Sequence, residues 1–361
     1  FNNCPVPKEN LLANRGDGFK MALNILNTGR IKLAAGSVGG AKFACSNSVQ
    51  YATQRFQFEK SIAEFGAIQH KIGEMATRAF AVESALYRTG RMIDQKYDEL
   101  KAAGESDNDA KQKAIREFAV ECAILKVTGS ETVTYGVDET IQVLGGMGYS
   151  MEQGAEMGYR DARITRIYEG TNEINRMLSV GELMKRAYKT KEVNLLKAGK
   201  ELPGLLLKEW LPLPTSGKFG KEESIVESLK KAFLLISGAA GRKLKLKLVD
   251  EQEIVINLAD ILAEAFIAES LLLRVKKLTA DKSLNQEHLD IKKKMLQLYL
   301  YEALAKVRKA GADAIASYAT GAERTIVSKL LDVLTESYDV NPKDLRRAIA
   351  KTVIEANQYC F

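Results

Sequence analysis

The sequence predicts an all-α protein made of two helical domains. Only six prolines occur among 361 residues, and none lies between Pro7 and Pro203. A proline inside a helix costs about 3 kcal/mol, so an interval of this length is typical of long helices. Apolar residues also recur at steps of three and four, which places them on one face of a helix. We therefore expect helical domains over residues 19–190 and 221–361, joined by a linker over 191–220.

Composition and charge are those of an ordinary globular protein, with 46% hydrophobic and 27% charged residues. The chain has no run of about 18 apolar residues, so we expect no membrane-spanning helix. The net charge of +7 is spread along the chain among acidic residues, which favours solvated helix faces over nucleic-acid binding. Four widely spaced cysteines without a CxxC pair predict no metal site. They favour a reducing compartment, either a bacterial cytoplasm or one like the mitochondrial matrix.

The first residues indicate that the chain begins inside a larger protein. It starts at Phe1, without an initiator methionine or a signal segment. The segment VPKEN, followed by a turn containing Gly16 and Gly18, is typical of a strand that leads into a helix. We interpret residues 1–18 as the end of a preceding β-domain and its entry turn.

Four helices are expected in the first domain. Apolar stripes predict helices around residues 31–52 and 68–86, and helical periodicity predicts a third over roughly 110–143 and a fourth over 171–189. Four long helices joined by short polar loops form a four-helix bundle.

The second domain follows a change of composition. Residues 201–220 contain three prolines and three glycines, which is typical of a linker. Its leucines 205–207 and Trp210 admit two interpretations, an anchor on a membrane surface or packing against the first bundle. Beyond it we expect a helix around residues 254–272, a lysine-rich helix over about 286–318 and two shorter ones.

A short internal similarity suggests that the two domains are related. Residues 79–88 read AFAVESALYR and residues 265–274 read AFIAESLLLR, at an offset of 186. A divergent duplication explains the similarity, and chance resemblance between two buried helices is the alternative.

The segment RITRIYEGTNEINRM, residues 163–177, is the densest polar cluster. Thr171 is a suitable N-cap, so Glu169 is expected in the turn just before a helix. A carboxylate flanked there by apolar residues can be partly desolvated and act as a base. An ordinary exposed turn glutamate is the alternative.

Two other segments are weaker signals. In IQVLGGMGYS, residues 141–150, Gly145 and Gly146 allow close approach of a ligand or a neighbouring helix, although a helix C-cap also explains them. In YATQRFQFEK, Arg55 offers a fork for phosphate oxygens and Phe58 an aromatic face, although a surface ion pair is the commoner role for such an arginine.

Taken together, GRIKLAAGSVGGA, YATQRFQFEKSIAEFGAIQ, IQVLGGMGYSME and YRDARITRIYEGTNEINR resemble the C-terminal helical domain of the acyl-CoA dehydrogenases. The resemblance covers about residues 1–190, and the helical extension to residue 361 resembles the very-long-chain branch. It implies dehydrogenation of a long-chain fatty acyl-CoA to trans-2-enoyl-CoA. It further implies FAD as cofactor, electron-transfer flavoprotein as electron acceptor, and a homodimer or larger assembly.

The same resemblance implies roles for individual residues. Glu169 would remove the α-proton, and Gly29, Arg30 and Gly170 would contact the substrate. Some relatives carry the base at the position of Gly29, so Glu169 has no rival carboxylate there. The residues expected at FAD are Arg55, Gln57, Phe58, Gln142, Gly145, Gly146, Thr171 and Glu173, of which Gln142, Gly145 and Gly146 would serve the partner subunit's cofactor.

One departure and two alternatives accompany the resemblance. Glu59 stands where the family has glycine, which puts the phosphate environment in question. The alternatives are an acyl-CoA oxidase and a non-enzymatic assembly protein that keeps the bundle as a docking surface. The presence of Arg30 and Glu169 argues against the second alternative. Without the preceding β-domain, we expect residues 1–361 alone to be helical, colourless and inactive as a dehydrogenase.

Overall fold

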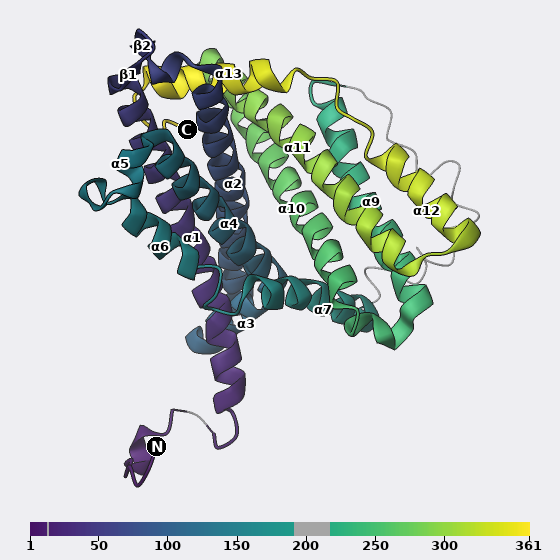
Figure 1. Cartoon of the computed structure of the whole chain (residues 1–361). Coiled ribbons are helices and arrows are strands. Elements are labelled where there is room, and N and C mark those ends of the chain that lie inside the picture. The colour runs from purple at the N-terminus through teal and green to yellow at the C-terminus, as the bar shows by residue number, and fades with distance from the viewer. Residues whose placement is uncertain (13, 191–216) are drawn as a thin grey trace.

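The computed structural model describes residues 1–12, 14–190 and 217–361 and has an all-α fold (Figure 1). The first part of the chain begins with a 3₁₀ turn, η1 (Lys8–Asn10), and two long helices that flank a small hairpin: α1 (Gly18–Gln54), β1 (Phe56–Gln57), β2 (Lys60–Ser61), the 3₁₀ turn η2 (Ile62–Glu64) and α2 (Gly66–Ala102). It continues with α3 (Asp107–Glu117), α4 (Ala119–Leu144), α5 (Gly146–Tyr149), η3 (Met151–Gln153), α6 (Ala155–Ile164) and α7 (Asn172–Thr190).

Five helices make up the remainder of the described chain: α9 (Gly220–Leu244), α10 (Gln252–Ala280), α11 (Gln286–Tyr318), α12 (Gly321–Leu334) and α13 (Pro342–Glu355), with the 3₁₀ segment η4 (Lys245–Val249) before α10. In Figure 1, α1, α2 and α4 run side by side, and α7 runs crosswise from α4 toward the lower end of α10. The helices α9 to α12 form a second group on the other side of α2.

One hydrophobic core joins the two groups of helices. Its buried members extend from α1 and α2 into α9, α10 and α11, and they include Phe80, Leu125, Leu235 and Leu271. The helix α13 returns from the second group to cover α2. A Cβ atom at Gly73 would lie 2.7 Å from the Arg346 carbonyl oxygen, so only glycine lets the backbone of α13 approach α2 this closely. The long helices are therefore held mainly by tertiary burial of their apolar faces.

Most of the predicted helices are confirmed. The helices expected around 31–52, 68–86, 171–189, 254–272 and 286–318 correspond to α1, α2, α7, α10 and α11, and the two short C-terminal helices are α12 and α13. The prediction of one helix over 110–143 was wrong, because the backbone leaves helical geometry at Phe118 (φ −102°, ψ 31°). This break turns α3 onto α2 while α4 aligns with α1.

Two further differences concern α9 and the first residues. The apolar stripe of α9, which includes Val226, Leu229, Phe233 and Ile236, has helical spacing that the prediction overlooked. No strand forms within residues 1–12 and 14–18, where the structure instead has η1. A strand needs a hydrogen-bonded neighbour, and this segment has none within the described chain. The leucines 205–207 and Trp210 lie outside the described residues.

The similar segments of α2 and α10 contact each other reciprocally. Glu83 binds Arg274 at 2.8 Å, and the equivalent Glu269 binds Arg88 at 2.7 Å. Each arginine also lies over the phenylalanine of the other segment, Arg274 over Phe80 and Arg88 over Phe266. All these residues are paired at the offset of 186. Such two-way contacts are what an internal duplication with approximate two-fold symmetry produces, as in an isologous interface.

None of the helices within residues 1–12, 14–190 and 217–361 combines the length and the apolar character needed to cross a bilayer.

Candidate active site

The turn between α6 and α7 carries Glu169. Both Glu169 (φ 58°) and Gly170 (φ 83°) have left-handed backbone conformations, which glycine adopts freely but glutamate does not. Thr171 then begins α7, because its hydroxyl accepts a hydrogen bond from the Ile174 N–H at 3.3 Å. The predicted N-cap is thereby confirmed, and Glu169 is in the turn just before the helix.

A buried arginine of α1 fixes this turn. The Arg30 Nε atom donates to the Glu169 carbonyl oxygen at 3.3 Å, and its Nη1 atom donates to Asn27 Oδ1 at 2.8 Å. Arg30 is only 4% exposed, and its burial lowers the pKa of the guanidinium. From the other side, the Asn175 side chain bonds the turn's carbonyl groups. The structure thus brings Gly29, Arg30, Glu169, Gly170 and Thr171 together.

The Glu169 carboxylate lies against Gly29. A Cβ atom at Gly29 would be only 2.5 Å from Glu169 Oε2 and 2.6 Å from Cδ. The Oε2 atom is buried and has no hydrogen-bond partner among the described residues. A buried, unpartnered carboxylate oxygen is costly, and such atoms in native structures often serve a function.

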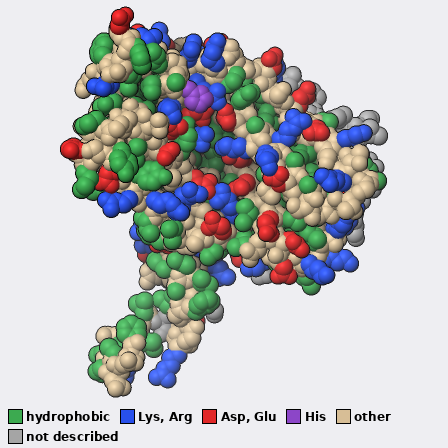
Figure 2. Space-filling model, viewed as in Figure 1, with side chains coloured by type: hydrophobic (Ala, Val, Ile, Leu, Met, Phe, Trp, Pro, Cys, Tyr) green, Lys and Arg blue, Asp and Glu red, His purple; other side chains and the backbone are tan. Residues whose placement is uncertain are grey.

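An apolar groove of about 960 Å³ runs from Glu169 along α1. Small residues form its floor on α1, and Val133, Val137 and Met157 contribute its apolar sides; the small residues are Gly29, Gly36, Ser37 and Gly40. Hydrophobic side chains also gather on the left of Figure 2, over α5 and α6, where Tyr149 and Met151 are exposed. The groove's volume and lining are typical of a site for an apolar ligand.

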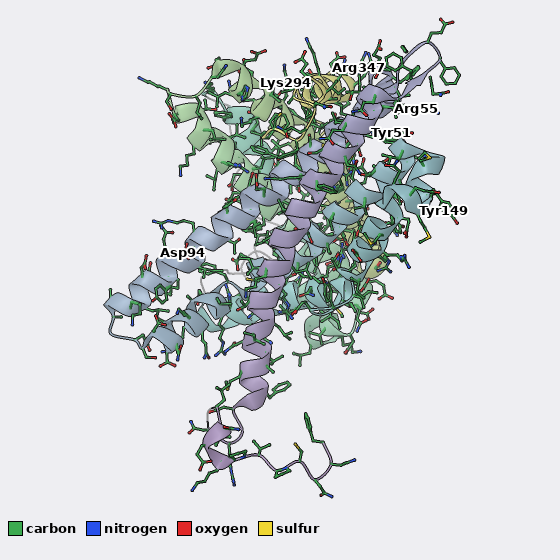
Figure 3. All side chains as sticks on the ribbon, turned by 90° about the vertical axis from the view of Figure 1, so that its left-hand side faces the viewer. Tyr51, Arg55, Asp94, Tyr149, Lys294 and Arg347 are labelled. Carbon is green, nitrogen blue, oxygen red and sulfur yellow. The ribbon has the colours of Figure 1, made fainter. Side chains whose placement is uncertain are left out.

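The residues expected at the FAD phosphates and adenine lie at the other end of α1. Arg55, Gln57 and Phe58 belong to the hairpin that follows α1, and Figure 3 shows Arg55 at this end of the helix. The ends of α1 and α4 meet there in a small core cluster of Ala52, Ala63, Val143 and Leu144. Gln142, Gly145 and Gly146, at the end of α4, are therefore near the hairpin. At 1.5 Å per residue, the 25 residues from Arg30 to Arg55 span roughly 37 Å.

Glu59 lies at the tip of the hairpin, in a backbone conformation that favours glycine. Phe58 (φ 54°) and Glu59 (φ 68°) both adopt positive φ, the pattern of a two-residue type I′ turn. Glycine is favoured at the second position of that turn, whereas glutamate is strained there by about 1 kcal/mol. Phe58 is 86% exposed, so its ring faces solvent.

The glycines after α4 have separate roles. Gly145 (φ 62°) ends α4, as the C-cap interpretation predicts. A Cβ atom at Gly145 or Gly146 would meet nothing within 4 Å, so both leave their outer side open. Close packing occurs instead at Gly148, where a Cβ atom would lie 2.7 Å from the Ile141 carbonyl oxygen. The sequence interpretation missed this position.

A buried lysine near the turn was also missed. Lys126 of α4 is fully buried, and its Nζ atom donates to Asn172 Oδ1 at 2.8 Å. Burial lowers its pKa to about 8. Asn172 in turn donates to Ser130 and Glu131, so α4 holds the first residue of α7. The sequence signal for a buried lysine was its place in the apolar run CAILKV. Such a pattern shows that Lys126 lies on a helix, but it does not show that this face of the helix is buried. Within the described chain, no group of three His, Cys, Asp or Glu could hold a metal ion.

The fold and the position of this turn match one family. Residues 16–184 and residues 228–335 match two family models, each described as "Acyl-CoA dehydrogenase, C-terminal domain". The chain belongs to the acyl-CoA dehydrogenase family. Both helical groups are matched by models of the same description, which agrees with the reciprocal contacts between α2 and α10.

Individual relatives agree with this assignment. A probable acyl-CoA dehydrogenase of Bacillus subtilis is 37% identical over 99% of this chain and 60% of its own. The very long-chain specific acyl-CoA dehydrogenase of Macaca fascicularis is 32% identical over 86% of this chain and 47% of its own. The crystal structure of the acyl-CoA dehydrogenase from Bacillus anthracis, complexed with FAD, superposes with a TM-score of 0.91 at 35% identity. That match covers 99% of this chain and 60% of the other. The chain thus spans about half to three fifths of the length of these relatives.

Proposed function

We propose that the intact protein carrying this chain is a flavin-dependent acyl-CoA dehydrogenase, which converts a long-chain fatty acyl-CoA to its trans-2-enoyl-CoA. The observation that carries this proposal is the Glu169 carboxylate, which faces Gly29 and has one buried oxygen without a hydrogen-bond partner in the described part of the chain. A carboxylate in this state is available to take a proton from a substrate carbon. The small-residue floor and apolar sides of the adjoining groove suit a long acyl chain.

Two groups of the turn divide the work of proton removal. Glu169 accepts the α-proton at its carboxylate. That proton is weakly acidic until the thioester carbonyl is polarised, so the site also needs a donor to the carbonyl oxygen. The backbone N–H of Glu169 makes no hydrogen bond to the described residues and is available for this role. Arg30 holds the carbonyl group of the same residue and so keeps both functional groups in place.

The exposed side chains at the hairpin, which have no charged partner within the described chain, suit the binding of a flavin dinucleotide. The Arg55 guanidinium has no ion-pair partner in the described part of the chain, and the exposed Phe58 ring offers a flat surface. At the other end, Thr171 and Glu173 lie at the start of α7, directly after the turn that carries Glu169. FAD, when bound, accepts the hydride from the β-carbon. Because these two ends of α1 are roughly 37 Å apart, we propose that they contact different FAD molecules in a homodimer.

The variant Glu169→Gln tests the role of the base. The exchange keeps the size of the side chain and removes its basicity, so we expect kcat to fall at least about 10²–10⁴-fold with flavin absorbance nearly unchanged. Glu156→Gln on α6, a half-buried residue that pairs with the exposed Arg160 and does not line the groove, is the matched control and should keep full activity. A Glu169→Gln enzyme with more than about a tenth of wild-type kcat would refute the assignment.

The electron acceptor and the location are further parts of the proposal. We propose electron-transfer flavoprotein as the acceptor, and an oxygen-uptake assay with acyl-CoA distinguishes this from an oxidase. Rapid oxygen consumption would favour the oxidase. All four cysteines are free thiols, which supports a reducing compartment such as a bacterial cytoplasm or the mitochondrial matrix.

A further inference from the structure

The side chain of Asn175 is bonded to three consecutive carbonyl groups of the Glu169 turn. Its Nδ2 atom lies 3.3 Å from the Glu169 oxygen, 2.8 Å from the Gly170 oxygen and 3.0 Å from the Thr171 oxygen. Asn175 is on α7, one turn after the helix begins, and is fully buried. A single amide group therefore spans the whole left-handed turn from inside the protein.

The orientation of this amide is determined by its surroundings. If the amide were reversed, its oxygen would face three carbonyl oxygens with no donor between them. In the observed orientation, Asn175 Oδ1 is buried and has no hydrogen-bond partner among the described residues. Leaving a buried acceptor unsatisfied is unfavourable. The Asn175 oxygen therefore stays without a hydrogen bond, while the NH₂ group of the same side chain bonds the carbonyl groups of the turn.

The Asn172 N–H closes the turn, but apart from Asn175 a single described side chain, that of Arg30, bonds its carbonyl groups. Its left-handed conformation is unfavourable at Glu169, and Arg30 adds a single hydrogen bond, to the same Glu169 oxygen that Asn175 contacts. Gly170 leaves room for the amide, since a Cβ atom there would lie 3.1 Å from Asn175 Nδ2. Strained backbone at a functional site persists only where its surroundings impose it.

We propose that Asn175 is a positioning residue, whose amide holds the strained turn so that the Glu169 carboxylate points across the groove at Gly29. This inference rests on the proposed function of Glu169 as the base. The Asn175 side chain hydrogen-bonds only backbone carbonyl groups of the turn and does not line the groove, so we expect it to act through the backbone of the turn. Its loss should lower the rate of proton removal and leave binding of the acyl chain largely unchanged.

The test uses Asn175→Leu in the intact FAD-loaded protein. Leucine has the same branching and no donor, and it also removes the unsatisfied oxygen, so it separates the effect on the turn from the effect on stability. The control is Val180→Ala, a core truncation on the same helix at a residue that is 1% exposed. This truncation should lower the melting temperature without contact with the turn.

Two measurements are compared between the variants. The first is kcat and KM for a long-chain acyl-CoA. The second is amide exchange at Asn172 without substrate, because its N–H closes the turn by donating to the Arg166 carbonyl oxygen at 3.1 Å. For Asn175→Leu we expect kcat to fall about 10–100-fold, with KM within about threefold, since displacement of a catalytic group by 1 Å costs about 10²-fold. Exchange at Asn172 should accelerate at least about tenfold. Val180→Ala should change neither by more than about threefold.

The proposal is overturned if Asn175→Leu leaves both kcat and the exchange at Asn172 unchanged. It is also overturned if Val180→Ala changes kcat and exchange as much as Asn175→Leu does for the same decrease in melting temperature. The exchange measurement does not depend on catalysis. An active Glu169→Gln enzyme would therefore refute the base while the exchange result still decides whether Asn175 holds the turn.

Discussion

Replacing Gly29 by alanine should displace the Glu169 carboxylate and lower kcat about 100-fold. The new methyl group would lie 2.5 Å from Oε2 and 2.8 Å from Oε1, whereas ordinary van der Waals contact begins at 3.4 Å. One of the two groups must then move by about 1 Å. Arg30 and Asn175 hold the backbone of the turn, and α1 is packed against α4, so the carboxylate is the group that yields. A displacement of 1 Å at a catalytic group costs about 10²-fold in rate.

The matched control is Gly39→Ala, on the same helix. A Cβ atom there would meet nothing within 4 Å, and Gly39 does not line the groove. Both substitutions improve helix propensity by about 1 kcal/mol, so any difference in kcat between them comes from the contact with Glu169. Steady-state kcat is measured at saturating acyl-CoA together with the melting temperature. If Gly29→Ala retained kcat within about threefold of Gly39→Ala, the carboxylate would not depend on the space at Gly29, and the reasoning would be refuted.

Two predictions concern buried charges. Glu83 is 4% exposed and binds both Lys42 and Arg274, whose side chains are 29% and 28% exposed, so Glu83→Gln should lower the free energy of unfolding by about 1–3 kcal/mol, measured with urea. The side chain of its counterpart Glu269 is 25% exposed, so Glu269→Gln should lower the free energy of unfolding by less than Glu83→Gln does. Equal decreases in the two variants would contradict this prediction. Burial lowers the pKa of Lys126 to about 8, so the unfolded chain, with an ordinary lysine pKa of ~10.4, binds more protons between these values. The free energy of unfolding therefore gains from this group as pH rises from about 8 to about 10, and Lys126→Met should remove that gain; an unchanged pH slope would show that the lysine has an ordinary pKa.

Much of the site could be anticipated from residue types. Thr171 as an N-cap, Gly145 as a C-cap and Glu169 in the turn before a helix all follow from local backbone rules, and all three are confirmed. Gly148 could not be separated from its neighbouring glycines, because the atom that requires it belongs to Ile141, on the preceding helix α4. Lys126 looked like an ordinary helix residue, since only the packing of α4 against α7 shows that it is buried.

The helical class and most helix positions follow from patterns along the chain. Hydrophobic spacing and the absence of proline act within a few residues, so their effect can be found along the chain. Tertiary structure alone decided the break at Phe118, because α3 and α4 align with different partners. It also decided the reciprocal pairing of Glu83 with Arg274 and of Glu269 with Arg88, which brings together residues more than 180 positions apart. The same holds for the Glu169 carboxylate, whose surroundings come from α1 and from Asn175. A sequence pattern records which side chains share a helix face, but the contacts across that face depend on how all the apolar faces are buried together.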